Sequence, residues 1–241
     1  MVKYWQVTQR FGCDVLELNF LNEFGIKHGL VIKTQGRDID EAGVYRSLSA
    51  RHKTVVTSQV HGCDIRRVDS MFDKFYPHRV EADGLMTDRN DVVLTIHTAD
   101  CLPVYLASSD RRCLALVHAG WKGTADKFAA KAVDVFCSEY GLSPKELVAA
   151  IGPGIEADCY QVGSEVAERF QPEHARADAN GKWLLDLRNA NRDQLLTAGM
   201  KPCNIYVSDF CTKCHSGMFH SYRREGKLKG KMIAFMEAPD D

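Results

Sequence analysis

Short apolar runs rich in β-branched residues recur along the chain and constrain its fold more than any other feature. They lie at residues 55–60, 92–96, 104–106, 114–117, 148–151, 205–207 and 232–235. Their length and composition are typical of β-strands. Several follow one another without an intervening helical pattern, as between residues 92 and 117. Segregated strands favour an α+β fold over a regular doubly wound sheet, so we expect a single layered domain of mixed sheets flanked by helices.

One helical pattern is clear among these strands. Between residues 125 and 140, apolar side chains recur at spacings of three and four, which predicts a helix with one buried face. Thr124 is suited to begin this helix as its N-cap, and Gly141 is suited to end it. The sequence contains no internal repeats, low-complexity tracts or Pro/Gly/Ser linkers, so we expect one domain spanning residues 1–241.

The charge balance disfavours polyanionic partners. Lys and Arg together number 31 against 32 for Asp and Glu, so no net field attracts nucleic acid or an acidic membrane surface. The first ten residues are too polar for a secretory signal, and no apolar stretch approaches the roughly 18 residues of a membrane helix. We therefore expect a soluble, cytoplasmic protein that binds a small molecule and neither nucleic acid nor membranes.

The nine cysteines are read as core residues, ligands or nucleophiles before disulfides, because their number is odd and the chain is expected to be cytosolic. Cys113 and Cys137 lie in apolar runs and are interpreted as core residues. Residues 211–215 (CTKCH) formally match a c-type haem attachment motif, which belongs to exported proteins and is therefore rejected.

A second metal set is conceivable near the C-terminus. Its members would be Cys203, Cys211, Cys214 and His215. Because Cys214 and His215 are too close in sequence to act together easily, we interpret these cysteines as solvated or core thiols.

Three potential ligands lie where predicted strands meet loops. His61 follows residues 55–60, Cys101 separates two apolar runs, and His118 closes residues 114–117. Strand ends are where functional side chains are commonly presented. Two imidazoles and one thiolate are a normal zinc ligand set and leave a fourth position open for water or substrate. Their wide spacing along the chain also permits a plainer interpretation, namely three satisfied polar residues in a core.

The same residues permit catalysis without a metal. Cys101 would then be a nucleophile that His118 deprotonates. A buried, inert thiol is an equally good interpretation of Cys101 taken alone.

Two further segments are candidates for binding anions. In residues 120–124 (GWKGT), Gly120 and Lys122 precede the predicted helix and are suited to hold phosphate, although an ordinary turn into a capped helix has the same pattern. Tyr222 and Arg223 combine a ring with a guanidinium, which suits binding of a phosphate or a sugar hydroxyl while a ring stacks nearby. A surface arginine pair flanking an edge strand is the alternative.

Several blocks together resemble one known family. They are residues 59–62 (QVHG), 82–84 (ADG) with Thr87, 98–103 (TADCLP), 118–123 (HAGWKG), 151–153 (IGP), 159–163 (CYQVG), 186–187 with Asn191, and 221–224 (SYRR). In this order they resemble the YfiH-like family, also described as laccase-like multicopper polyphenol oxidoreductases. Its members are regarded as zinc-dependent purine nucleoside phosphorylases with adenosine deaminase activity.

The resemblance implies a function and assigns roles. It implies a Zn²⁺ ion on His61, Cys101 and His118, acting on adenosine, inosine, guanosine or methylthioadenosine together with phosphate. Asp100 is then an acid/base or an orienting residue, while Gln59 and Arg223 contact the substrate. The copper label fits poorly, because multicopper catalysis needs a further histidine-rich cluster that this sequence does not visibly supply.

Two departures and two alternatives accompany the resemblance. Residues 32–36 (IKTQG) lack an arginine that the family uses near its substrate, and Gly154 replaces a family cysteine. We therefore expect deamination to survive better than phosphate-dependent cleavage.

Two alternative functions remain open. They are a Cys-His hydrolase or amidase that edits peptidoglycan precursors, and a non-catalytic interaction protein in which a fourth protein ligand closes the zinc site.

Overall fold

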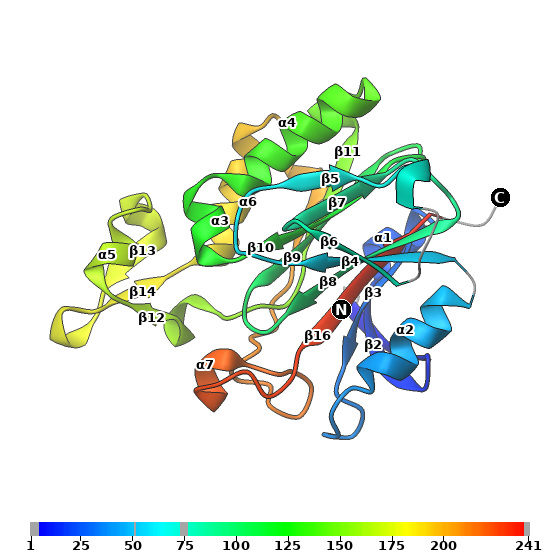
Figure 1. The fold of residues 1–241 in the computed structure, drawn as a ribbon. Coiled ribbons are helices and arrows are strands. Elements are labelled where there is room, and N and C mark those ends of the chain that lie inside the picture. Colours follow the sequence, from blue (N-terminus) through cyan, green and yellow to red (C-terminus); the bar gives the residue numbers. More distant parts are fainter. Residues whose placement is uncertain (1–4, 51, 73–76, 239–241) are drawn as a thin grey trace.

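Two large β-sheets form the centre of the computed structural model, which describes residues 5–50, 52–72 and 77–238 (Figure 1). The seven-stranded sheet has the order β1 (Trp5–Arg10), β2 (Cys13–Leu18), β3 (Lys27–Ile32), β16 (Met232–Glu237), β8 (Val92–Thr98), β4 (Lys53–Ser58), β6 (His78–Glu81). The six-stranded sheet has the order β15 (Ile205–Val207), β11 (Leu147–Ile151), β9 (Leu102–Ser108), β10 (Leu114–Ala119), β7 (Gly84–Thr87), β5 (Ile65–Arg67). A small third sheet holds β12 (Gln161–Val162), β14 (Trp183–Leu185) and β13 (Ala175–Ala177).

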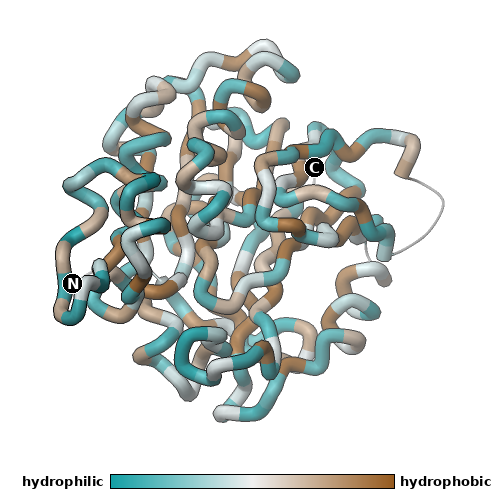
Figure 2. The backbone as a smooth tube through the Cα atoms, turned by 60° about the vertical axis from the view of Figure 1, so that its left-hand side comes forward, coloured by the Kyte–Doolittle hydropathy of each residue, from teal (hydrophilic) through white to brown (hydrophobic). Residues whose placement is uncertain are grey.

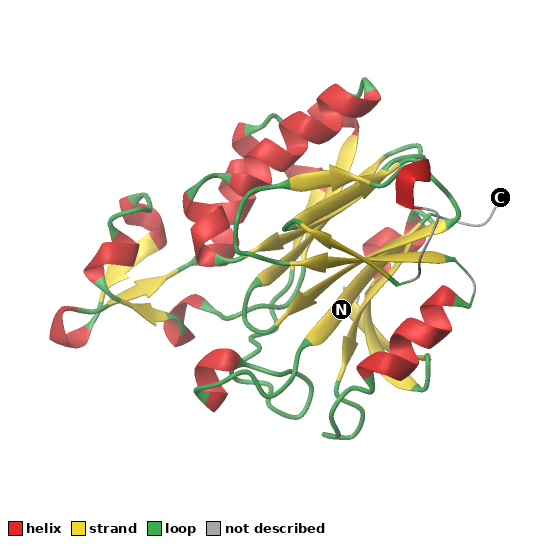
Figure 3. Cartoon of the chain, in the orientation of Figure 1, coloured by secondary structure: helices red, strands yellow, loops and turns green. Residues whose placement is uncertain are grey.

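Helices lie outside the two large sheets (Figure 3). They are α1 (Asn19–Glu23), α2 (Glu41–Ser49), α3 (Trp121–Ala125), α4 (Phe128–Tyr140), α5 (Ser164–Ala167), α6 (Leu187–Thr197) and α7 (Tyr222–Glu225). No helix among the described residues is long and apolar enough to cross a membrane.

The predicted mixture of strands and helices is confirmed. Every predicted apolar run contributes to a strand, and β8, β9 and β10 follow one another without a helix between them. Both large sheets contain parallel and antiparallel pairs: β4 runs parallel to β8, whereas β16 runs antiparallel to it, and β11 pairs with β15 in parallel but with β9 antiparallel.

Alternating side chains build a layered core. Along β9 and β10, Leu106 and Val117 belong to the apolar cluster that includes α4 and α6, whereas Tyr105 and Leu116 belong to the cluster between the two sheets. The other face of the seven-stranded sheet packs against α2 through residues such as Leu48. Strands buried on both faces have nearly continuous apolar sequences. In Figure 2, hydrophobic (brown) stretches run through the middle of the molecule.

The helix predicted for residues 125–140 begins later than expected. Lys127 has a left-handed backbone with φ 59° and separates α3 from α4, so Thr124 lies inside α3 and does not cap the longer helix. The helical apolar periodicity starts with Phe128, which turns into the core at this point. The predicted end is confirmed, because Gly141 adopts φ 65° after the last turn.

Two cysteine predictions are also confirmed. Cys113 and Cys137 are each 8% exposed and belong to the cluster beneath α4. Burial raises the pKa of both thiols, which keeps them protonated and unreactive.

Candidate active site

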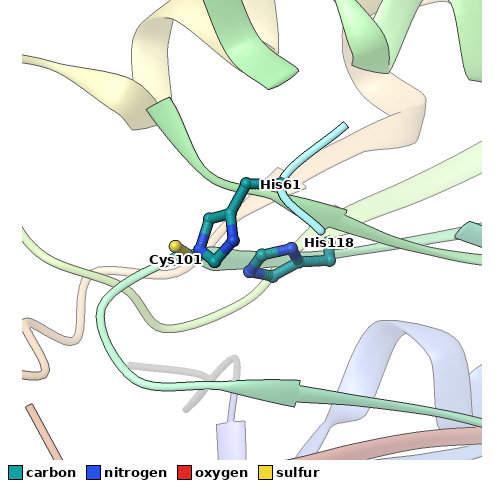
Figure 4. A group of neighbouring side chains, drawn as sticks. All are labelled: His61, Cys101 and His118. Atoms are coloured by element: carbon teal, nitrogen blue, oxygen red, sulfur yellow. The ribbon is translucent and has the colours of Figure 1, made fainter. Parts of the chain in front are cut away.

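His61, Cys101 and His118 meet at one end of the two-sheet core (Figure 4). His61 follows β4, Cys101 lies in the connection that crosses from β8 in one sheet to β9 in the other, and His118 lies in β10. Their ligand atoms all lie within 4.8 Å of one another. His118 is buried, Cys101 is partly buried and His61 is exposed, so the group is accessible from the side of His61.

The backbone near this group is held in an uncommon conformation. His61 has φ 61° and Asp100 has φ 90°, which for residues other than glycine costs on the order of 1–3 kcal/mol each. The carboxylate of Asp83 accepts hydrogen bonds from the backbone N–H groups of Val60, His61 and Gly62, at 3.2, 3.0 and 2.7 Å. Asp83 therefore fixes the turn that carries His61.

Asp83 also orients His118. The His118 ring donates from Nδ1 to Asp83 Oδ1 at 2.9 Å, and both side chains are buried. A carboxylate partner on one ring nitrogen sets the tautomer and leaves the other nitrogen free to bind a metal. Burial raises the pKa of Asp83, but hydrogen bonds from His118 and from the backbone outweigh it and lower the pKa overall.

Cys101 and His118 favour each other's charged form. Burial raises the pKa of the Cys101 thiol, but the facing His118 and His61 outweigh burial and lower it to about 6. Burial likewise lowers the pKa of His118, and Cys101 and Asp83 outweigh it and raise the pKa to about 9. The sulfur is thus favoured as a thiolate, which both a metal ion and a nucleophilic mechanism require.

Gly120 lies directly against the three candidate ligands. A β-carbon at this position would stand 3.0 Å from Cys101 Sγ and 3.2 Å from His61 Cδ2. These distances are shorter than ordinary van der Waals contacts, so the arrangement depends on glycine here.

The segment predicted as a phosphate-binding loop is helical. Gly120 is the N-cap of α3, which begins at Trp121. Lys122 is exposed, and its ammonium lies 5.8 Å from the ring centroid of Trp121. Among the described residues that line the neighbouring cavity, Lys122 is absent, so the structure does not bring it to the site.

A cavity of about 720 Å³ opens in front of the His-Cys-His group. This volume is within the range of small-molecule sites, about 300–1,000 Å³. Besides the candidate ligands and His97, its walls carry the rings of one Trp and two Tyr residues and the side chains of two Arg and one Lys. These residues are Trp121, Tyr160, Tyr222, Arg79, Arg223 and Lys231.

Asp100 connects the cavity to α7. Its Oδ1 accepts a hydrogen bond from Thr212 Oγ1 at 2.6 Å, and its Oδ2 accepts one from the backbone N–H of Arg223 at 2.7 Å. The Arg223 guanidinium donates to the Gln161 carbonyl and lies 4.9 Å from the ring centroid of Tyr160. Asp100 therefore holds α7, whose Tyr222 and Arg223 line the cavity, and ties it to the loop after β15 that carries Thr212.

Gln59 and Tyr222 also line the cavity. The Gln59 amide donates to the His97 carbonyl at 2.6 Å, and its oxygen accepts from the His97 N–H at 2.9 Å, so the end of β4 is tied to β8. Tyr222 is 55% exposed, and its ring stands at the mouth of the cavity.

The structure locates the two departures from the family pattern. Lys33, in the segment where the family carries arginine, donates to the Ser216 carbonyl at 3.4 Å and is not among the described residues that line the cavity. Gly154 packs against Leu102, and a β-carbon there would also stand 2.9 Å from the Asp100 carbonyl oxygen. A cysteine does not fit in this position without a shift of the backbone.

Sequence reasoning missed several residues of the site. Only one feature of the sequence pointed to Asp83 as a hydrogen-bond acceptor in the site, namely its place in the family block at residues 82–84. Arg79 and Lys231 reach the cavity from β6 and from the residue before β16, and Tyr160 reaches it from the segment before β12. Tyr160 had one signal, its place in the block 159–163, whereas the positions of Arg79 and Lys231 depend on strand pairing across the fold, which no local pattern specifies.

Comparison with known proteins gives the following similarities. A family model described as multi-copper polyphenol oxidoreductase laccase matches residues 40–238. Purine nucleoside phosphorylase YlmD of Geobacillus stearothermophilus is 36% identical over 194 residues, which are 76% of this chain and 71% of that protein. Adenosine deaminase RL5, from an unknown prokaryotic organism, is 36% identical over 189 residues, 73% of this chain and 72% of that protein.

Solved structures agree over nearly the whole chain. The crystal structure of YlmD from Geobacillus stearothermophilus superposes with a TM-score of 0.86 at 30% identity, covering 98% of this chain and 99% of that one. The Bacillus licheniformis hypothetical protein YfiH superposes with a TM-score of 0.82 at 28% identity, covering 93% and 96%.

Proposed function

The chain belongs to the laccase-like multi-copper polyphenol oxidoreductase family, and from this membership we propose that it is a zinc-dependent purine nucleoside phosphorylase with adenosine deaminase activity. The observation that carries the proposal is the His61, Cys101 and His118 group, which opens onto a cavity of about 720 Å³. The names of the relatives YlmD and RL5 support both halves of the activity.

The donor set fits zinc. Two imidazole nitrogens and one thiolate are common zinc ligands, and three protein ligands are typical of catalytic zinc. Within the part of the chain that the structure describes, no fourth His, Cys, Asp or Glu joins this group. The other candidate group there consists of cysteines alone, which argues against a histidine-rich multicopper centre. When bound, zinc supplies a Lewis acid that activates water or polarises a purine.

The surrounding residues hold the substrates. Trp121, Tyr160 and Tyr222 line the cavity, and the ring of Tyr222, which is 55% exposed, offers a face on which a purine can stack. Arg79, Arg223 and Lys231 offer positive charge for phosphate. Asp100, whose two oxygens already accept hydrogen bonds from within the chain, acts in this proposal as a positioning residue and not as the acid/base.

We propose that residues 1–241 form one catalytic domain, because segments at the ends of strands in both large sheets supply the site. In this role the enzyme acts in the cytoplasm, with a nucleoside and phosphate as its ligands. The Cys-His hydrolase remains the second candidate, because the pKa of Cys101 is lowered beside His118.

Chromatography of the products tests the reaction. Adenosine incubated with the zinc-loaded protein should yield inosine, and added phosphate should yield free base with ribose 1-phosphate. Both activities should disappear in His118→Ala and persist in His52→Ala, whose ring lies 3.6 Å from Glu237, outside the residues that line the cavity.

Phosphorolysis should be the weaker activity. Lys33 does not supply the phosphate contact of the family's arginine, and loss of one charge-assisted contact of about 1.5–3 kcal/mol weakens binding roughly ten- to a hundredfold. A fully zinc-loaded protein that left adenosine, inosine and guanosine unchanged would contradict the proposed function and favour a peptidoglycan-type substrate.

A further inference from the structure

A second group of three thiols lies apart from the His-Cys-His group. The sulfurs of Cys159, Cys211 and Cys214 all lie within 4.8 Å of one another, and the Cys159 and Cys214 sulfurs are 3.3 Å apart. Cys159 ends the 3-10 turn Ala157–Cys159, whereas the other two belong to the loop after β15. The group therefore joins two segments that are distant in sequence.

This group differs from the set suggested by the sequence. Cys203 is exposed, and its thiol donates to Asn204 Oδ1 at 3.5 Å. His215 places its Nδ1 2.9 Å from the Cys211 carbonyl. Neither is a member of the three-sulfur group; Cys159 takes the third position instead. The sequence-based interpretation of Cys211 and Cys214 as solvated or core thiols does not explain why their sulfurs lie within 4.8 Å of the Cys159 sulfur.

The turn at residues 211–214 is shaped to stabilise a thiolate. The Cys211 sulfur accepts a hydrogen bond from the backbone N–H of Glu156 at 3.5 Å, and the backbone N–H groups of Lys213 and Cys214 also point at it. A Cys-x-x-Cys turn is a common source of two zinc ligands, and hydrogen bonds to ligating sulfurs are typical of thiolate metal sites.

The spacing of the sulfurs suits a single soft cation. Two sulfurs bound tetrahedrally to zinc at about 2.3 Å lie about 3.8 Å apart. The Cys159 and Cys214 sulfurs, 3.3 Å apart, are somewhat closer than this, and the other pairs are no more than 4.8 Å apart, so small side-chain movements bring all three sulfurs to the separation that zinc requires. Three thiolates this close to one another would repel one another without a cation, and a metal ion that replaces the thiol protons removes that repulsion.

We propose that Cys159, Cys211 and Cys214 bind one zinc ion at a site separate from the His61, Cys101 and His118 group. This ion cross-links the turn at residues 157–159 to the loop at residues 211–214. The loop in turn supports the cavity rim: Thr212 donates to Asp100, and Arg224 donates to the carbonyl of Thr212 at 2.7 Å. Three cysteines leave the fourth zinc position to water, and the ion's role is to cross-link these two segments, so the site does not depend on the proposed nucleoside chemistry.

Zinc content tests the proposal. Protein prepared in reductant with zinc and without chelator should carry about two zinc ions per chain, and Cys159→Ser/Cys214→Ser should carry one. The zinc ion retained at the His61, Cys101 and His118 group shows that this variant folds. Cys203→Ser is the matched control, because its exposed thiol lies outside the group, and it should keep both ions.

Cadmium titration of the same proteins gives a second readout. Thiolate-to-metal charge-transfer absorption should be several-fold stronger for the wild type than for the double variant. The variant lacks two of the four candidate ligating sulfurs, and its Cys211 has no second thiolate beside it to hold a metal ion. Equal zinc content and equal absorption in the wild type and the double variant would overturn the proposal. A Cys159–Cys214 disulfide found by mass spectrometry in the reduced preparation would overturn it as well.

Discussion

Replacing Cys101 by alanine is expected to remove the metal ion at the His61, Cys101 and His118 group and to lower kcat/KM for adenosine by at least about 100-fold. The sulfur is one of three candidate ligands, and even residues that only orient a ligand typically change metal affinity or activity 10- to 100-fold. Elemental analysis and product chromatography on the same preparation measure both effects. The zinc content should fall by about one ion per chain.

Cys113→Ala is the matched control. Cys113 is also a poorly exposed cysteine, but it packs in the cluster beneath α4 and should affect neither metal content nor turnover. If Cys101→Ala lost its activity yet kept full zinc, Cys101 would be a nucleophile paired with His118, and the Cys-His hydrolase would replace the zinc enzyme as the preferred function.

Gly120→Ala is expected to lower metal affinity and turnover at least about tenfold without unfolding the protein. The added β-carbon would stand 3.0 Å from Cys101 Sγ and 3.2 Å from His61 Cδ2, so the two candidate ligands must move apart. The change removes no hydrogen-bonding side chain and introduces no charge. Zinc affinity by competition with a chelator, together with steady-state kinetics, measures the loss.

Gly217→Ala controls for the general effect of a glycine substitution. A β-carbon at Gly217 meets no atom within 4 Å, so metal affinity and turnover should stay at wild-type values. Thermal unfolding of both variants separates a local effect from a loss of fold. Unchanged zinc affinity and activity in Gly120→Ala would mean that the ligands lie farther from the start of α3 than in this structure.

The sequence predicted the central strands well because they are buried on both faces. The apolar runs at residues 92–96 and 114–117 could be identified without tertiary information, because a strand that is buried on both faces has a nearly continuous apolar sequence. The boundary between α3 and α4 was wrong for the opposite reason. Lys127 adopts a left-handed backbone, which cannot be predicted from its residue type. Because the short helix α3 was therefore interpreted as a loop, Lys122 became a candidate for phosphate binding.

The candidate site was predictable only in part. His61, Cys101 and His118 were selected because their chemistry and their positions at strand ends are visible locally. Asp83 and Cys159 were not selected, because their significance comes from partners that pack against them in the fold. Asp83 reaches across 35 residues to His118, and Cys159 reaches across 55 residues to Cys214. Such long-range contacts can be predicted only when the pairing of the strands and the positions of the loops are known.

Anomalous diffraction at the zinc absorption edge, on crystals of the protein grown without chelator, tests the proposed catalytic metal most directly. The expected result is a zinc peak among His61, Cys101 and His118, with no fourth protein ligand and the open position facing the cavity. An empty group would contradict the proposed zinc enzyme, as would a copper signal at this position or a fourth protein side chain that closes the coordination sphere.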